Sequence, residues 1–334
     1  MGSALTTGLF TFAGTHVLIG VLAWLAPRAG WVDRPGGHKH HLGDVPVIGG
    51  LAVMLAVSLS VWLAGPPGAR STVVLAGMAA LCLLGLVDDR WSMSARTRII
   101  IQANVVALVL VLADVQLISL GSWVPGIDDL QLGWAMMPFS VFCVVGVINA
   151  FNMVDGMDGL SSSLFLLVAA ALWLLMSTAG SDAGLLFLLS TMIAAMLAFL
   201  CWNWPLRWRL QRIFLGDAGT LPIGLLLGVL LVDTSQQPNA LAPAAALWLF
   251  AWPLIDTVSV ILRRLTQGKS AFSADQRHIH HLVVAGRIQC PPDMDCWPML
   301  AQGLMAGSGF ADDTPGWPMC GSPAAFWSSR SGVI

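Results

Sequence analysis

Nine long apolar runs restrict what this chain can fold into. They cover residues 4–26, 46–64, 71–87, 99–118, 133–150, 160–180, 183–202, 219–234 and 240–262. A helix needs about 20 such residues to cross a hydrocarbon core, and the balance of 57% hydrophobic to 10% charged residues lies outside the range of soluble domains. The runs are continuous, which favours helices over the alternating strands of a β-barrel. We predict an all-α polytopic membrane protein with about nine transmembrane helices.

Basic residues gather in every second loop, which predicts the orientation of the chain. After the first run they occur at 28–39, 90–98, 207–212 and 263–287, whereas the intervening loops hold only Arg70. Short loops rich in Lys and Arg stay on the cytoplasmic side. The first run is too long for a signal peptide and has no basic residue before it, so we treat it as a span. We expect the N-terminus outside and the long polar loops, with the active site, in the cytoplasm.

Two adjacent acids, Asp88 and Asp89, follow the third apolar run in the stretch GLVDDRW. Neighbouring carboxylates repel each other and stay ionised only beside cations or a metal. The simpler interpretation is a solvated helix end whose acids pair with Arg90. The two acids alone do not decide between a functional site and a solvated helix end.

The stretch NMVDGMDGL carries Asp155 and Asp158, with Asn152 just upstream. Acids three residues apart share one side of a helix. A polar turn would explain the glycines, but not two acids in a loop without a basic residue. Mg²⁺ would explain them, because it takes one or two carboxylates and completes its shell with water and phosphate.

The stretch LGDAGT places Asp217 directly before the eighth apolar run. Taken alone, this acid is best interpreted as an N-cap that accepts the first free amides of a helix. The same amides could hold a phosphate.

A histidine loop follows the ninth run, among several cations. Its members are Arg264, Lys269, Arg277, His278, His280 and His281. Three histidines beside a row of cations favour a polyanion site over a solvated loop. Acids for Mg²⁺ and cations for phosphate are typical of phosphoryl transfer, and neither a Walker A motif nor a zinc spacing occurs.

The order of these segments resembles the polyprenyl-phosphate N-acetylhexosamine-1-phosphate transferases. The matching motifs are DRP, VDD with SARTR, NMVDGMDGL, GDAGT, RRL and HIHH, between residues 30 and about 286. The resemblance implies transfer of a sugar-1-phosphate from a UDP-sugar to undecaprenyl phosphate, release of UMP, and a need for Mg²⁺, with Mn²⁺ as the alternative. HIHHL is similar to the WecA branch, which uses UDP-GlcNAc. The branch that uses UDP-MurNAc-pentapeptide usually has an acid where Leu282 stands.

The resemblance also implies roles for individual residues. Asp88 matches the candidate base, beside Asp89; Asp217 matches the metal-binding acid; Asp155 and Asp158 match acids near the metal and the nucleotide, and we count Asp155 as a second metal ligand. Residues expected at the substrates are Asp33, Arg34, Arg98, Asn152, Arg264, Lys269, Arg277, His278, His280 and His281. The implied setting is the bacterial inner membrane, with a UDP-sugar and a lipid phosphate as partners and no nucleic acid. Whether the protein forms a homodimer is left open.

Two further hypotheses compete with this one. A transporter is suggested by Asp114 and Asp256, which fall inside apolar runs, although the other acids crowd one face and no internal repeat is visible. An inactive truncated homologue is suggested by residues 287–334, which contain no run long enough to span. We therefore divide the chain into a transferase domain, 1–286, and an atypical tail, 287–334. An altered reading frame after residue 286 would explain the tail, and resequencing the coding DNA would test this.

Overall fold

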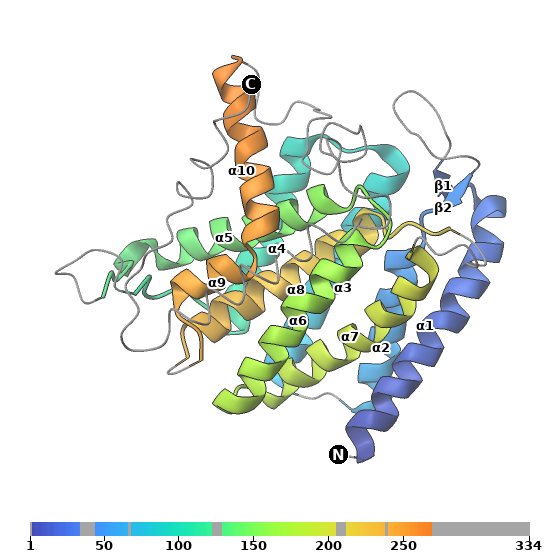
Figure 1. Ribbon diagram of the computed structural model, residues 1–334, viewed down its shortest axis with the longest axis horizontal. Helices are drawn as coiled ribbons and strands as arrows, with labels where there is room; N and C mark the ends of the chain where they lie inside the picture. Colours follow the sequence, from blue (N-terminus) through green and yellow to red (C-terminus); the bar gives the residue numbers. More distant parts are fainter. Residues whose placement is uncertain are drawn as a thin grey trace, which may run out of the picture.

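The computed structural model describes residues 2–33, 44–65, 68–121, 129–204, 212–237 and 240–268. Within these ranges the chain is mostly helical (Figure 1). The α-helices are α1 (Gly2–Ala29), α2 (Gly49–Ala64), α3 (Ala69–Trp91), α4 (Ala95–Leu112), α5 (Met136–Val154), α6 (Leu160–Ala179), α7 (Ala183–Asn203), α8 (Asp217–Ser235), α9 (Pro243–Leu249) and α10 (Ala251–Thr266). A 3-10 turn, η1 (Gly133–Ala135), precedes α5, and the short strands β1 (Val32–Asp33) and β2 (Val45–Pro46) pair antiparallel.

The chain is mostly helical with several candidate membrane spans, as expected of a polytopic membrane protein, but the number of nine spans is not confirmed. In the described part of the chain, seven helices are long and apolar enough to cross a membrane, or up to eight if α9 and α10 count as one bent span. The second run yields only the 16-residue helix α2. The ninth run bends by 81° between α9 and α10. Pro253 explains the break, because a proline ring clashes with the carbonyl four residues earlier, here that of Leu249.

Asp114 is not inside a span as the apolar run suggested. Helix α4 ends at Leu112, and Asp114 follows in a turn with φ of 52°. Its place outside the helix removes part of the support for a transport path. Asp256 does lie within a helix, α10, where it is 2% exposed.

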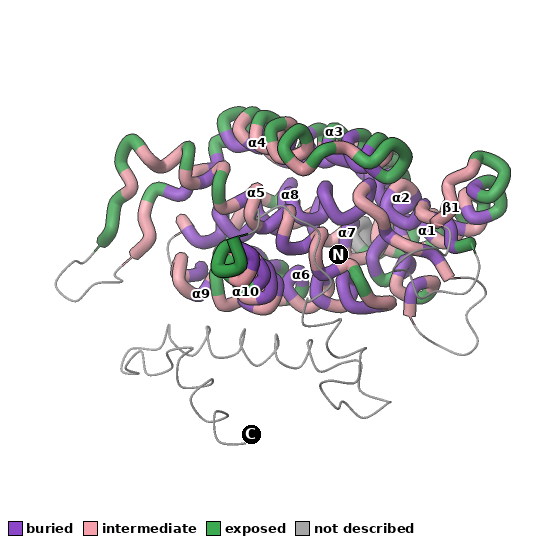
Figure 2. Tube along the Cα trace, turned by 90° about the horizontal axis from the view of Figure 1, so that it is seen from above, coloured by how far each residue is buried: buried purple, intermediate pink, exposed green. Residues whose placement is uncertain are grey.

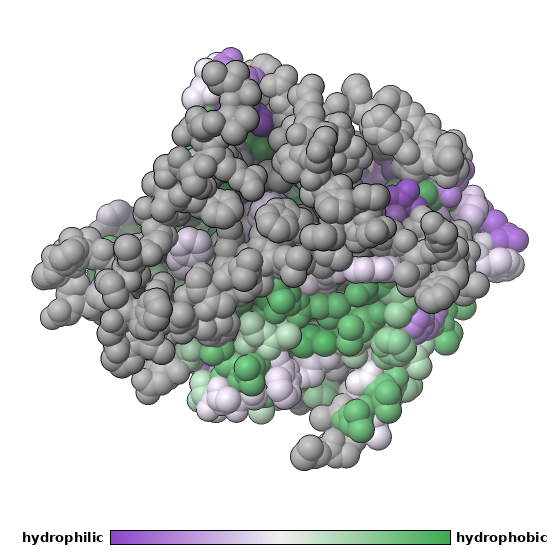
Figure 3. All heavy atoms as spheres, viewed as in Figure 1, coloured by the Kyte–Doolittle hydropathy of each residue, from purple (hydrophilic) through white to green (hydrophobic). Residues whose placement is uncertain are grey.

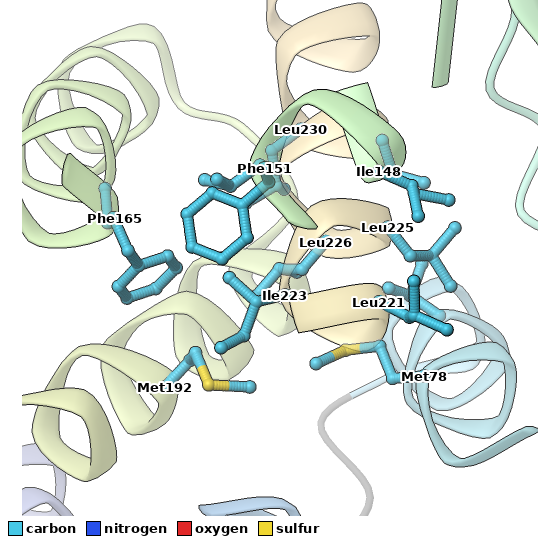
Figure 4. Packing of buried hydrophobic residues seen from close by; sticks show 14 of the residues in the cluster. Met78, Ile148, Phe151, Phe165, Met192, Leu221, Ile223, Leu225, Leu226 and Leu230 are labelled. Atoms are coloured by element: carbon cyan, nitrogen blue, oxygen red, sulfur yellow. The ribbon is translucent and has the colours of Figure 1, made fainter. Parts of the chain in front are cut away.

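Helix α8 is the centre of the bundle. All its residues after Asp217 are buried, and Figure 2 shows it buried along its length, between α3 and α4 on one side and α6, α9 and α10 on the other. Figure 4 shows how its leucines pack against Ile148 and Phe151 of α5, with Met78 of α3 and Met192 of α7 nearby. A helix that is apolar on every side is stable only when it is enclosed in this way.

Glycines let two neighbouring helices approach the start of α8 closely. A Cβ added to Gly50 of α2 would lie 2.1 Å from the amide nitrogen of Gly219. A Cβ added to Gly85 of α3 would lie 2.3 Å from the carbonyl carbon of Asp217. Small residues at such crossings are typical of membrane helices, whose packing depends on close backbone contact. These two glycines therefore set the position of the first turn of α8.

The far end of α8 is held by an ion pair. Arg70 of α3 pairs with Asp233 in the last turn of α8 and donates through Nε to the carbonyl of Ala113, at 2.8 Å. An acid near a helix C-terminus is unfavourable by itself, because the helix dipole is negative there. Arg70, which stood apart from the other basic residues in the sequence, compensates for this charge.

The outer surface agrees with a lipid-facing bundle. Large apolar side chains are exposed on several helices, among them Trp24, Trp62, Leu83 and Phe142. In Figure 3 apolar atoms form a continuous area on the lower half of the visible face, and hydrophilic atoms gather at its upper right.

We predict that Gly85→Ala destabilises the protein by about 1–3 kcal/mol or more, because the added methyl overpacks the crossing of α3 and α8. Gly146→Ala in α5 is the matched control, since a Cβ there meets nothing within 4 Å. Thermal unfolding in detergent should show a clearly lower midpoint for Gly85→Ala and little change for Gly146→Ala. Equal midpoints for the two variants would contradict the close approach.

Candidate active site

Helix ends that are far apart in sequence meet at one end of the bundle, here called the site end. It comprises the C-terminal ends of α3, α5 and α7 and the N-terminal ends of α4, α6 and α8. The segment before α8 is fastened to α2, because the amides of Gly49 and Gly50 donate to the carbonyls of Phe214 and Leu215, at 3.0 and 2.9 Å. These contacts bring the acidic motifs together. The sequence had indicated this, because the motifs fall in loops on the same side of the membrane.

Arg98 of α4 joins two of the expected acids. Its Nη1 donates to Asp88 Oδ2 at 2.7 Å and to Asp217 Oδ2 at 3.0 Å. The side chain of Asp88 is only 6% exposed, and its Oδ1 accepts the amide of Met93 at 2.6 Å. One guanidinium therefore neutralises carboxylates from α3 and α8, and Asp88 is more than a solvated helix end.

The partner suggested for this acidic pair, Arg90, lies elsewhere. Arg90 Nη1 donates to the carbonyl of Gly30, at 3.2 Å, so it ties α3 to the segment that follows α1. The correct cation, Arg98, stands ten residues from Asp88 along the chain, across the tight turn between α3 and α4.

Asp217 is not an N-cap. It is the first residue of α8, and the N-cap position belongs to Gly216, which makes no side-chain cap. Instead, Asp217 Oδ1 accepts from Nδ2 of Asn152 at 2.6 Å, and the same nitrogen donates to the hydroxyl of Thr220 at 2.7 Å. The carboxylate of Asp217 is thus held between Arg98 and Asn152 and points into the site.

Asp89 accepts the helix amides that Asp217 was expected to accept. Its Oδ1 accepts from the amide of Asp217 at 3.0 Å and its Oδ2 from the amide of Ala218 at 3.2 Å. The first free amides of α8 are therefore satisfied by an acid from another helix.

Asp155 lies in a turn directly after α5, not on a helix shared with Asp158. Its Oδ1 accepts from the hydroxyl of Ser161, at 2.6 Å. Burial raises the pKa of Asp155 to about 6, the nearby charges of Asp89 and Asp158 add to the rise, and the Ser161 hydrogen bond opposes it. A cation bound beside this carboxylate would favour its ionised form.

Asp158 already has a cation, which comes from a different loop. Arg212 donates through Nε and Nη2 to its Oδ1, at 2.9 and 2.8 Å, and the guanidinium lies 5.1 Å from the ring centre of Phe214. Sequence reasoning missed this pair, because 54 residues separate its members. Asn203 makes a similar link, accepting the amide of Gly159 and donating to the carbonyl of Ile213.

A second polar pair lies deeper between α4 and α5. Asn149 Nδ2 donates to Oε1 of the fully buried Gln102, at 2.8 Å, and Gln102 is one turn beyond Arg98 on α4. The sequence contained a signal for it, since Gln102 interrupts an apolar run. Polar side chains inside membrane helices commonly hydrogen-bond between helices in this way.

Several expected substrate residues lie outside the described residues. They are Arg34, Lys269, Arg277, His278, His280 and His281, and the tail 287–334 lies outside as well. Asp33 is described in β1, opposite Val45, and Arg264 is buried in the last turn of α10. The site as described therefore consists of the acids, Arg98 and Asn152.

The donor atoms at the site suit a hard cation. Asp88, Asp155, Asp217 and Asn152 offer only oxygen acceptors, which Mg²⁺ and Mn²⁺ prefer. Within the described ranges no three His, Cys or Asp side chains converge as a complete metal cage. Mg²⁺ needs no such cage, because it keeps waters and binds through one or two carboxylates plus substrate phosphate. The residues present therefore fit this ion.

Comparison with known proteins identifies the family. The model of glycosyl transferase family 4 matches residues 71–235, which include Asp88, Arg98, Asn152 and Asp217. A protein of Salmonella typhi, named undecaprenyl-phosphate alpha-N-acetylglucosaminyl 1-phosphate transferase, is 35% identical over 287 residues, covering 84% of this chain and 77% of its own. The chain belongs to glycosyl transferase family 4.

Other members of the family are similar over nearly the same span. The protein of the same name from Escherichia coli strain K12 is 34% identical over 281 residues, 84% of this chain and 74% of its own. A Bacillus subtilis protein, named as a probable undecaprenyl-phosphate N-acetylglucosaminyl 1-phosphate transferase, is 29% identical over 272 residues, 80% of this chain and 74% of its own. The resemblance that the motifs suggested is confirmed.

We predict that Asp155→Asn stabilises the metal-free protein above pH 6 and loses this effect below about pH 4. The pKa of Asp155 is raised on folding, so its ionised form costs stability as the pH rises through about 6, whereas the protonated form does not. A rise of this size corresponds to about 2–3 kcal/mol. Unfolding midpoints of both proteins, measured in EDTA from pH 4 to 8, check this. A difference that does not change with pH would contradict the assigned cause.

We predict that Asp158 and Arg212 are energetically coupled by about 1–2 kcal/mol, because two charge-assisted hydrogen bonds join them. A double-mutant cycle with Asp158→Asn and Arg212→Gln, read by unfolding in detergent, measures the coupling. The matched cycle of Asp158→Asn with Arg28→Gln should be additive, since Arg28 donates to the carbonyl of Trp24 within α1. Additivity in both cycles would show that the pair contributes nothing.

Proposed function

We propose that this protein transfers GlcNAc-1-phosphate from UDP-GlcNAc to undecaprenyl phosphate and releases UMP, which starts the synthesis of an envelope polysaccharide. The observation that carries the proposal is the convergence of Asp88, Arg98, Asn152 and Asp217 at one end of the bundle. The family and the names of the similar proteins from three organisms support the choice of reaction. The site end then faces the cytoplasm of a bacterial inner membrane, in agreement with the distribution of basic loops.

Both substrates are anionic, so charge neutralisation is the main requirement of the reaction. In an in-line displacement, a phosphate oxygen of the lipid attacks the β-phosphorus of UDP-GlcNAc, the phosphoanhydride bond breaks, and UMP leaves. Bound Mg²⁺ would supply positive charge to the pyrophosphate and to the leaving UMP. Asp217 would hold the ion with Asp155, while Asp88 and Asn152 keep Asp217 and Arg98 in place.

Arg98 has a second use in this scheme. A guanidinium held between two carboxylates has already lost much of its side-chain freedom, so binding a phosphate through its remaining N–H groups costs little further entropy. Asp88 stands beside it, where the lipid phosphate would arrive. A phosphate monoester with a second pKa near 6 is mostly dianionic at pH 7. Asp88 Oδ2 would therefore accept a proton only from the small fraction of lipid phosphate that is still a monoanion.

Most of the remaining residues of the proposed site lie outside the described part of the chain. The residues that would contact the nucleotide diphosphate are Arg34, Lys269, Arg277, His278, His280 and His281. Asp33 and Arg264, which are described, precede Arg34 and the others, respectively, in the sequence. Cations that close over a pyrophosphate stabilise charge in the transition state without taking part in bond formation. The sugar specificity would be decided by the same residues.

We predict that the purified protein releases UMP from UDP-GlcNAc only when both undecaprenyl phosphate and Mg²⁺ are present. Asp217→Asn and Asp88→Asn should each lower the rate by about 100-fold or more, because an electrostatic contact to the reacting groups is lost. Asp129→Asn is the matched control, since Asp129 is an exposed acid that hydrogen-bonds Ser119 and Gln131. A panel of UDP-sugars, including UDP-MurNAc-pentapeptide, identifies the donor.

Three results would overturn the proposal. They are UMP release without the lipid, an unchanged rate in Asp217→Asn, and solute transport by vesicles in place of UMP release. Unchanged activity in EDTA would remove the metal from the scheme and leave the transferase itself in place.

A further inference from the structure

The two adjacent acids at the end of α3 have separate partners. Asp88 is buried and bonds to Arg98 and to the amide of Met93. Asp89 is exposed as a residue, yet each of its carboxylate oxygens accepts one backbone amide of α8, those of Asp217 and Ala218. An acid that sits on the first amides of a helix is a cap. Here the cap comes from a different helix.

Helix α8 cannot provide this cap itself. Its N-cap residue is Gly216, with φ of 71°, a conformation that favours glycine. A Cβ at this position would lie 2.5 Å from Cγ1 of Val47 and 2.8 Å from Oδ2 of Asp89. The Ser, Thr, Asp or Asn that usually caps a helix therefore has no room, and the amides depend on Asp89.

The packing around this contact leaves little freedom. Gly85, one turn before Asp89 on α3, lies against the backbone of Asp217, where an added Cβ would come within 2.3 Å of the carbonyl carbon. On the other side, Gly50 of α2 lies against the backbone of Gly219. The first turn of α8 is thus enclosed by α2 and α3, and Asp89 determines how its amides are directed.

We propose that Asp89 is a positioning residue, which fixes the first turn of α8 and thereby the carboxylate of Asp217, and that it does not contact the reactants. This inference rests on the proposed function only for the role of Asp217. The neighbouring Asp88 keeps the role proposed for it above, beside Arg98. Asp89 therefore acts through the backbone of Asp217, and its loss affects the rate by misplacing that carboxylate.

The test compares Asp89→Ala and Asp89→Asn with a matched cap elsewhere in the protein. Asp182 caps α7, its Oδ1 accepting from the amide of Leu185 at 2.8 Å, and it lies at the opposite end of α7 from Asn203. Asp182→Ala therefore removes a helix cap without touching the site. The measurements are hydrogen exchange of the amides of Asp217 and Ala218, followed by mass spectrometry, and the kcat and KM of UMP release.

For Asp89→Ala we expect exchange at the first turn of α8 to be at least about tenfold faster, because one acceptor is lost for each amide. We expect kcat to fall by about 100-fold, the effect of a small misplacement of a catalytic group, with KM for UDP-GlcNAc within about threefold. Asp89→Asn should recover kcat to within about tenfold of wild type, because its amide oxygen still accepts one bond. Asp182→Ala should speed exchange near Leu185 and leave kcat unchanged.

Two results would overturn the inference. One is an Asp89→Asn variant as slow as Asp217→Asn while exchange at the first turn of α8 stays as in wild type, which would place Asp89 in contact with the reactants. The other is unchanged exchange in Asp89→Ala. If wild-type protein releases no UMP, the proposed function fails, and the exchange comparison still decides whether Asp89 holds the turn.

Discussion

The burial of α8 is the constraint on which the rest of the structure depends. A helix enclosed on every side loses contact with water at its termini, so its free amides, carbonyls and charges need partners from the protein. Asp89 and Arg98 provide them at one end, and Arg70 at the other. Enclosure also requires close approach of neighbouring backbones, which explains glycines at positions 50 and 85. The site is built from the same contacts that make the central helix stable.

The contacts that hold the start of α8 also determine the charge balance of the site. In the described part of the chain, Asp88 and Asp217 bond to Arg98, and its charge also acts on Asp89. Asp155 lies near Asp89 and Asp158, and Arg212 is engaged with Asp158. Carboxylates outnumber cations here, so the site attracts positive charge, although its proposed substrates are polyanions. A divalent ion resolves this conflict, because it binds to the carboxylates on one side and to the phosphates on the other. The low dielectric around buried groups strengthens both the repulsion between the carboxylates and their attraction to a cation.

Much of the fold class and of the site composition could be predicted from the sequence, while most pairings could not. Apolar runs marked most helix ends within a few residues, because hydrocarbon thickness determines helix length, but α4 ends at Leu112, well before the end of its run. The number of nine spans is not confirmed, because one run is bent at Pro253 and the second run forms only the 16-residue helix α2. Arg90 was the nearest cation to Asp88, but the structure pairs Asp88 with Arg98. Asp158 had no basic residue in its own loop, and its partner, Arg212, comes from another.

The sequence by itself determined that this protein is a bundle of membrane helices, which family it belongs to, and which acids gather at one end. These properties follow from composition and short motifs, which are local. Only the tertiary structure decided which of two adjacent acids faces Arg98 and which caps α8. The reason is geometric, because the amides that bind Asp89 belong to residues 128 and 129 positions away. The division of roles between Asp88 and Asp89 is a property of how α3 packs on α8.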